Sequence, residues 1–191
     1  MKEIVVVTKS SLRLQRDLVL KLIRLGLPAG LSQAIFSLAA IVVQSLTNSF
    51  GTAIIASSIV VMRVDGFAMM PNFTFGTAMT TYTGQNVGAR QMDRVHQGTK
   101  DGAIIGLVTS SLLTVLILVF GRPLMGLFTN TPEVVSMSFH FMCILAAGYI
   151  AMSITQVLSG VMRGAGDTMT PMWISIITTV IIRVPIAYGI A

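Results

Sequence analysis

Residues 102–121 read GAIIGLVTSSLLTVLILVFG, which is twenty consecutive positions without a charged side chain. An α-helix rises about 1.5 Å per residue, so roughly twenty residues cross the hydrocarbon core of a bilayer. Asp101 and Arg122 close the stretch at its two ends. The segment therefore predicts a transmembrane helix rather than a buried helix of a soluble domain.

Four further charge-free stretches accompany this segment. They cover residues 25–62, 66–89, 134–162 and 168–182. The first of them, at 38 residues, is too long for one crossing, and the polar sequence TNSFGT at 47–52 divides it. The sequence thus predicts an all-α, polytopic membrane protein with five transmembrane helices. Their expected bounds are about 26–46, 53–81, 101–120, 133–161 and 171–191.

The composition of the chain agrees with a membrane protein. Of its 191 residues, 53% are hydrophobic and only 10% are charged, whereas soluble domains carry about 25% charged residues. The net charge of +6 does not favour nucleic-acid binding, because the basic residues stand in short segments between apolar runs. The single cysteine, Cys143, lies inside an apolar run and indicates no disulfide framework. We expect a lipid bilayer as the surroundings of this chain, and no nucleic-acid partner.

The distribution of arginine and lysine predicts the orientation of the helices. Residues 1–25 hold six of them, residues 82–100 hold three and residues 162–170 hold one. The segments that alternate with these, 47–52 and 121–132, hold none and one. Because loops rich in Arg and Lys stay in the cytoplasm, we expect a multi-pass protein of the cell (plasma) membrane whose N-terminus is cytoplasmic.

The segment before the first predicted helix is basic and also periodic. Residues 11–25 place Leu18 and Leu22 at helical spacing among four Arg and Lys side chains. Such a segment forms either an amphipathic helix on the cytoplasmic leaflet or an extension of the first span into water. We divide the chain into a cytoplasmic basic amphipathic connector, 1–25, and a membrane domain, 26–191.

Three charged residues lie inside predicted spans: Arg63, Asp65 and Arg183. If the second helix starts near Ala53, Arg63 lies about 15 Å deep. A charged side chain at that depth costs at least ~2.5 kcal/mol, and by default it marks a functional site. Positions two apart on a helix differ by about 200°, so Arg63 and Asp65 each need another partner. The two open interpretations are a role in transport and a structural ion pair, for example between Asp65 and Arg183.

Uncharged polar residues within the spans are weaker candidates. Gln33 in the first span could contact a ligand or make an interhelical hydrogen bond. No catalytic constellation is present, because the two histidines lie in different segments and no metal-ligand spacing occurs. We therefore expect neither an enzyme nor a bound metal or cofactor. Gly98, Gly102 and Gly106 repeat at four-residue spacing, which is typical of close helix packing in membranes.

Four short motifs carry a family resemblance. Residues 84–90, GQNVGAR, resemble the cytoplasmic loop GQNxGA…R of the multidrug and toxic compound extrusion (MATE) family. Residues 163–172, RGAGDTMTPM, are similar to the RGAGDT-x-x-P-M segment of that family. Residues 26–33, GLPAGLSQ, resemble the opening of its seventh helix, and residues 49–52, SFGT, resemble the outer turn that follows it. All four stand in the family's order and at its spacing.

The resemblance implies a secondary antiporter of twelve helices in two six-helix lobes. Such proteins expel lipophilic, mostly cationic compounds in exchange for protons or sodium. The five spans correspond to helices seven to eleven, a partial second lobe, so the resemblance implies a missing N-terminal lobe or a second copy as partner. We accordingly expect that the chain alone does not transport.

The acidic residues depart from one pattern of the family. Some relatives hold the coupling cation with a glutamate in helix seven and an aspartate in helix ten. Here the spans 26–46 and 133–161 contain only Glu133, at a helix end. Asp65 is the one carboxylate at depth, so proton coupling must use it or an acid of the missing lobe. The candidate transport and coupling residues are Asp65, Arg63, Arg183 and Gln33, and the coupling ion is H⁺ or Na⁺.

Two alternatives to the antiporter stay open at this point. One is a flippase of lipid-linked saccharides with the same broad fold. The cavity of such a flippase should be strongly cationic, whereas this chain offers only Arg63 and Arg183. The other is a membrane scaffold fragment that transports nothing.

Overall fold

A computed structural model describes residues 15–190, and every regular element in this range is helical. Five of its helical segments are long and apolar enough to cross a membrane, as the sequence predicts. The elements are α1 (Arg16–Thr47), the 3₁₀ turn η2 (Asn48–Phe50), α2 (Thr52–Gly88), α3 (Met92–Gly126), α4 (Pro132–Gly164), and a last span made of α5 (Met169–Ile176), the π-helical η3 (Ile177–Arg183) and α6 (Val184–Ile190).

The helices are longer than the predicted spans. The predicted loop 82–100 is wrong, because α2 continues to Gly88 and α3 begins at Met92. Hydropathy marks where the chain leaves the hydrocarbon, whereas backbone hydrogen bonds can carry a helix on into water. The turn forms at Arg90, whose φ of 58° is left-handed, and the amide of Gln91 donates to the carbonyl of Asn86 across it.

The first helix begins ten residues before the predicted bound of about residue 26. Pro28 lies in the interior of α1, which runs without interruption from Arg16. The helix therefore passes through residue 25 without a break. The remainder of the predicted connector, residues 1–14, lies outside the described residues.

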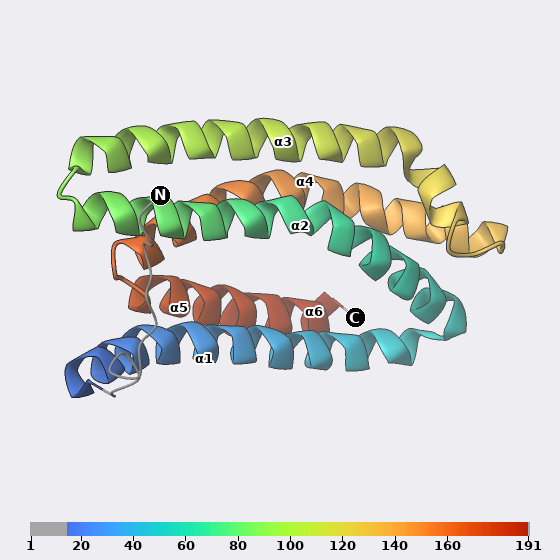
Figure 1. The fold of residues 1–191 in the computed structure, drawn as a ribbon. Helices are drawn as coiled ribbons and strands as arrows, with labels where there is room; N and C mark the ends of the chain where they lie inside the picture. The colour runs from blue at the N-terminus through green and yellow to red at the C-terminus, as the bar shows by residue number, and fades with distance from the viewer. Residues whose placement is uncertain (1–14, 191) are drawn as a thin grey trace, which may run out of the picture.

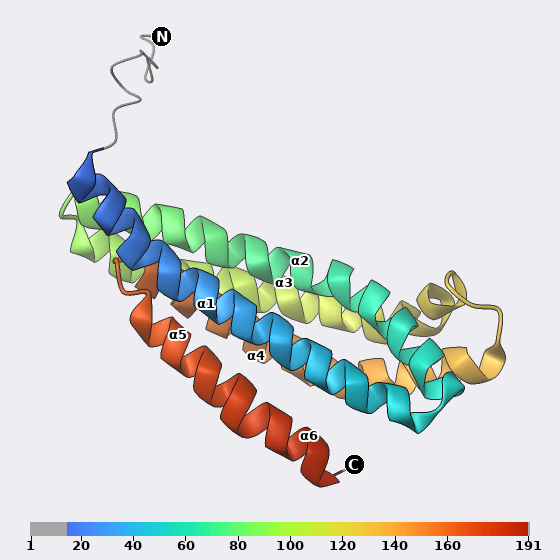
Figure 2. The same ribbon diagram turned by 90° about the horizontal axis from the view of Figure 1, so that it is seen from below.

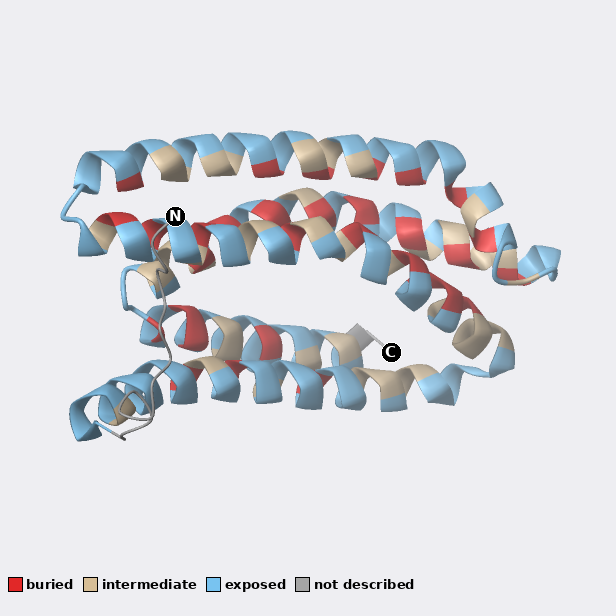
Figure 3. Cartoon of the chain, viewed as in Figure 1, coloured by how far each residue is buried: buried red, intermediate tan, exposed pale blue. Residues whose placement is uncertain are grey.

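The helices form two groups. In the first, α2, α3 and α4 pack on one another; in the second, α1 runs alongside α5, η3 and α6 (Figures 1 and 2). The buried residues of the first group lie on the faces that its three helices turn toward one another (Figure 3). The core of this group consists of Val60, Val61, Val64, Ala68, Ile117, Met125, Val134, Met142 and Tyr149.

The outward surface of α3 is apolar. Val108, Leu112 and Val119 are each at least 60% exposed. Exposed aliphatic side chains along one whole helix face would be costly in water but suit contact with lipid. The arrangement therefore agrees with a bundle that is embedded in a bilayer.

Helix α2 bends in its middle part while staying helical throughout (Figure 1). Pro71 lies inside it, and proline has no amide hydrogen for the carbonyl of Phe67. The loss of this hydrogen bond accounts for the bend.

Glycines bring α2 and α4 into direct backbone contact. A Cβ atom on Gly160 would collide with the carbonyl oxygen of Gly76, and one on Gly164 would lie 2.5 Å from the carbonyl oxygen of Thr80. The predicted role of the glycine repeat in packing is confirmed in α3, where a Cβ on Gly102 would lie 2.6 Å from the Met79 sulfur. In lipid the hydrophobic effect does not press helices together, and small residues instead let the backbones approach closely enough to pack.

We predict that Gly160→Ala destabilises the bundle by about 1–3 kcal/mol, because the backbones of α2 and α4 must separate to admit the methyl group. Thermal unfolding of the detergent-purified protein, followed by size-exclusion chromatography, measures the effect. Gly148→Ala is the matched control on the same helix, since nothing lies within 4 Å of its added methyl. It should be neutral or slightly stabilising, and equal losses in the two variants would contradict the packing argument.

Candidate functional site

Asp65 lies on the side of α2 that faces α4, and its side chain is half-buried. Its neighbour there is the hydroxyl of Tyr149, a side chain that is only 2% exposed. The same hydroxyl donates a hydrogen bond to the sulfur of Met142 over 2.9 Å. A carboxyl, a phenol and a thioether thus meet between α2 and α4.

The main chain of Tyr149 is held from two other helices. Its carbonyl oxygen accepts a hydrogen bond from the side-chain amide of Asn72 over 3.3 Å and from the hydroxyl of Ser110 over 2.9 Å. Asn72 and Ser110 are both buried. Side chains of α2 and α3 therefore meet at one carbonyl of α4, which fixes the position of Tyr149 within the group.

Sequence reasoning did not find Tyr149, Asn72 or Ser110. Asn72 and Ser110 could have been predicted to make interhelical hydrogen bonds, because an uncharged polar residue in the middle of a span needs a partner. Tyr149 could not have been singled out, since aromatic residues in apolar runs are common in helix cores.

Arg63 lies away from this cluster. Its side chain is exposed on α2, on the side opposite Asp65, as two positions along a helix dictate. The two residues therefore do not neutralise each other within the helix.

The other two candidates belong to the second helix group. The guanidinium of Arg183 lies over the ring of Phe36 on α1, 5.9 Å from its centroid, which is a cation–π contact. Gln33 is exposed on α1. Because η3 packs on α1 and makes no contact with α2, the structure does not bring Asp65 and Arg183 together. The four residues consequently do not form one site.

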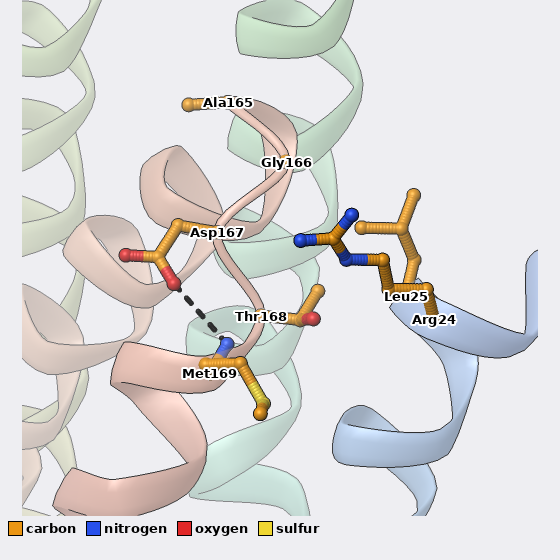
Figure 4. A pocket seen from close by; sticks show the side chains of 7 residues that line it. All are labelled: Arg24, Leu25, Ala165, Gly166, Asp167, Thr168 and Met169. Carbon is orange, nitrogen blue, oxygen red and sulfur yellow. Dashed lines mark hydrogen bonds between the residues drawn. The ribbon is translucent and has the colours of Figure 1, made fainter. Parts of the chain in front are cut away.

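A cavity of about 380 Å³ opens where α4 turns into α5, between that turn and Arg24 and Leu25 of α1 (Figure 4). Asp167 in this turn points away from Arg24 and accepts hydrogen bonds from the amides of Met169 (3.1 Å) and Thr170 (3.0 Å). Hydrogen bonds from the Thr170 side chain and from these amides lower the pKa of Asp167.

The last span begins slightly earlier than its predicted bound of about residue 171. α5 begins at Met169, and the carboxylate of Asp167 accepts hydrogen bonds from the first two amides of the helix. The first backbone amides of α5 are therefore already hydrogen-bonded to a carboxylate of this chain.

A second, wider groove of about 560 Å³ lies between α2 and α3. Its lining is almost entirely apolar and consists of Val64, Phe67, Ala68, Leu113, Leu116, Ile117, Phe120, Leu124, Leu127 and Phe128. Within residues 15–190, no group of three or more His, Cys, Asp or Glu side chains could hold a metal ion.

Comparison with known proteins gives the family. A profile of the MatE family matches residues 28–189. The "Probable multidrug resistance protein YoeA" of Bacillus subtilis is 29% identical over 177 residues, 93% of this chain and 38% of that protein. The "Probable multidrug resistance protein NorM" of Thermotoga maritima is 25% identical over 168 residues, 88% of this chain and 36% of that protein. The chain thus spans less than two fifths of the length of these relatives.

Solved structures show the same fold. One, described as an outward-facing conformation of a multidrug resistance MATE family transporter, has a TM-score of 0.85 and 21% sequence identity, with 95% of this chain and 41% of that chain covered. A transporter of the MOP superfamily from Pyrococcus furiosus has a TM-score of 0.82 and 18% identity, with 90% and 38% covered. The sequence motifs, the five spans and the profile match agree, and the chain belongs to the MatE family, whose members are membrane transporters rather than enzymes.

Proposed function

We propose that this chain is part of a secondary active antiporter that expels lipophilic, mostly cationic compounds in exchange for protons or sodium. Its family membership supports this function, as do relatives that are named multidrug resistance proteins. These relatives do not favour the flippase or the scaffold as an alternative.

The position of Asp65 is the observation that carries the coupling part of this proposal. Among the carboxylates of residues 15–190, it is the one that is not exposed, and it lies 13 residues inside α2. Its neighbours are a phenol and, through that phenol, a thioether. Sodium, as a hard cation, prefers several oxygen ligands, so these surroundings favour a proton as the ion that Asp65 exchanges.

We further propose that the protein lies in the plasma membrane with its N-terminus in the cytoplasm. The turn at Gln91 is then cytoplasmic and the turn at Asn130 is external; both residues are exposed, at opposite ends of α3 (Figure 1). Gln91→Cys and Asn130→Cys, each in a Cys143→Ser background, test this with an impermeant thiol reagent on intact cells. We expect labelling at position 130 only. Labelling at position 91 alone would invert the topology.

Transport should require a second lobe. Alternating access moves one repeat or bundle against another around a central site, and the exposed Arg63 needs a partner surface or water at its depth. We expect no drug resistance in a pump-deficient host that expresses this chain alone. Resistance should appear when the remaining helices of a MatE relative are co-expressed. Resistance from the chain alone would instead favour a functional homodimer.

In whichever of these assemblies transports, we predict that Asp65→Asn lowers drug export to the level of the empty vector, or removes its pH dependence. An amide cannot take up and release a proton in this range, although it fills the same space. Minimum inhibitory concentrations and drug efflux at several pH values measure the effect. Asp101→Asn, which changes an exposed carboxylate on α3, is the matched control. Normal, pH-dependent export by the Asp65 variant would assign Asp65 to a structural network.

A further inference from the structure

The turn between α4 and α5 leaves the polar groups of Thr168 unpaired within residues 15–190. The amides of residues 165–167 donate to carbonyls at the end of α4, and those of Met169 and Thr170 donate to the Asp167 carboxylate. In this part of the chain, neither the amide nor the hydroxyl of Thr168 donates to an acceptor, although the residue is only 9% exposed. Because unpaired buried donors are costly, a polar ligand beside this residue would be stabilised.

The space beside Thr168 is the cavity of about 380 Å³ between the turn and α1. The Thr168 hydroxyl points from the turn toward α1, and the Arg24 guanidinium points from α1 toward the turn (Figure 4). The carboxylate of Asp167 is turned away from Arg24 and is already bonded to two amides. A cationic donor and a neutral donor therefore face the same cavity from its two sides.

These donors suit a phosphate group. The guanidinium of Arg24 is a planar fork that matches two phosphate oxygens at once, and it stays charged at every physiological pH. The hydroxyl of Thr168 can donate to a third oxygen. The volume of the cavity also falls within the range of about 300–1,000 Å³ that is typical of small-ligand sites.

Apolar side chains next to the cavity place it at the surface of the bilayer. Leu25 and Met169 line it and are exposed, and the exposed Trp173 lies one turn further along α5. Tryptophan is enriched at the level of the lipid headgroups. A ligand in this cavity thus has its phosphate at headgroup depth and an apolar surface beside it, which is the chemistry of a phospholipid.

The charge of the neighbouring part of α1 favours an acidic lipid over a zwitterionic one. Besides Arg24, the segment 16–24 carries Arg16 and Lys21, against the single acid Asp17, and all four side chains are exposed. Basic segments beside a transmembrane helix attract anionic headgroups. The surroundings of the cavity therefore raise the local concentration of the lipids that fit it.

We propose that the cavity between α1 and the α4–α5 turn binds the phosphate of an anionic phospholipid, with Arg24 and Thr168 as its ligands. The acyl chains extend along α5 past Trp173. Helices α1 and α4 are not packed on each other, so the bound headgroup connects the two helix groups at this end of the bundle. The inference goes beyond the proposed function and rests on neither its substrate nor its coupling ion.

Trp173 is the single tryptophan of the chain, so its fluorescence tests the proposal directly. The full chain is placed in nanodiscs of phosphatidylglycerol and phosphatidylcholine, with bromine on the acyl chains of one lipid or of the other at the same composition. Brominated phosphatidylglycerol should quench Trp173 more strongly. The preference should be about tenfold, as for one hydrogen bond to a charged group.

Two substitutions in the cavity should remove this preference. Arg24→Ala deletes the cationic donor, and Thr168→Val deletes a hydroxyl without changing any charge, so both should bring the quenching by the two lipids close to equality. Lys21→Ala is the matched control for charge, one turn away on α1 and outside the cavity lining. Thr178→Val is the matched control for the hydroxyl, which bonds to its own helix at the carbonyl of Ile174. Both controls should keep most of the preference.

Three outcomes would overturn the proposal. Equal quenching of the wild-type protein by the two brominated lipids would show that the site does not select an anionic headgroup. Equal losses in Arg24→Ala and Lys21→Ala, with none in Thr168→Val, would assign the preference to diffuse surface charge. Loss of the preference in millimolar glycerol phosphate would assign the cavity to a soluble phosphate ester. Monodispersity of each variant separates a lost preference from a folding defect.

Discussion

The arrangement of the site depends on the backbone contact between α2 and α4, where Gly160 leaves room for the carbonyl oxygen of Gly76. In lipid there is no hydrophobic force to press helices together, so their separation is set by the size of the residues between them. With glycine at this crossing, side chains as short as that of Asn72 reach the neighbouring backbone. A larger residue at position 160 would move α4 away from Asn72 and Asp65 alike.

Polar contacts then fix the register of the same two helices along their length. Near the N-terminal end of α4, the hydroxyl of Ser138 donates to the carbonyl of Ser57 over 3.2 Å, and the Ser57 hydroxyl in turn lies 3.5 Å from the carbonyl of Val134. In the middle, Asn72 and Ser110 converge on the carbonyl of Tyr149. Each of these side chains would be costly in hydrocarbon without its partner, so α2 cannot slide along α4 without breaking several hydrogen bonds together.

The number of spans and their approximate places could be predicted from the sequence. A helix needs about 20 residues to cross the hydrocarbon core, and charged residues are rare within such a stretch. It was insufficient for the helix ends, since the left-handed turn at Arg90 and the cap at Asp167 depend on local hydrogen bonds that hydropathy does not register. Asp65 could be singled out by its charge. Its partner Tyr149 could not, because which face of α4 meets α2 is a property of packing and not of composition.

The length of α2 gives its bend a mechanical consequence. From Pro71 to Gly88 the helix runs about 26 Å, and Gly98 and Gly102 let α3 lie directly on the side chains of Tyr82 and Met79 along this stretch. α4 lies along the same stretch, since Gly160 and Gly164 bring its backbone against those of Gly76 and Thr80. The hairpin therefore cannot change its angle without carrying α4 with it, and a change in the bend at Pro71 would move this end of all three helices as one body.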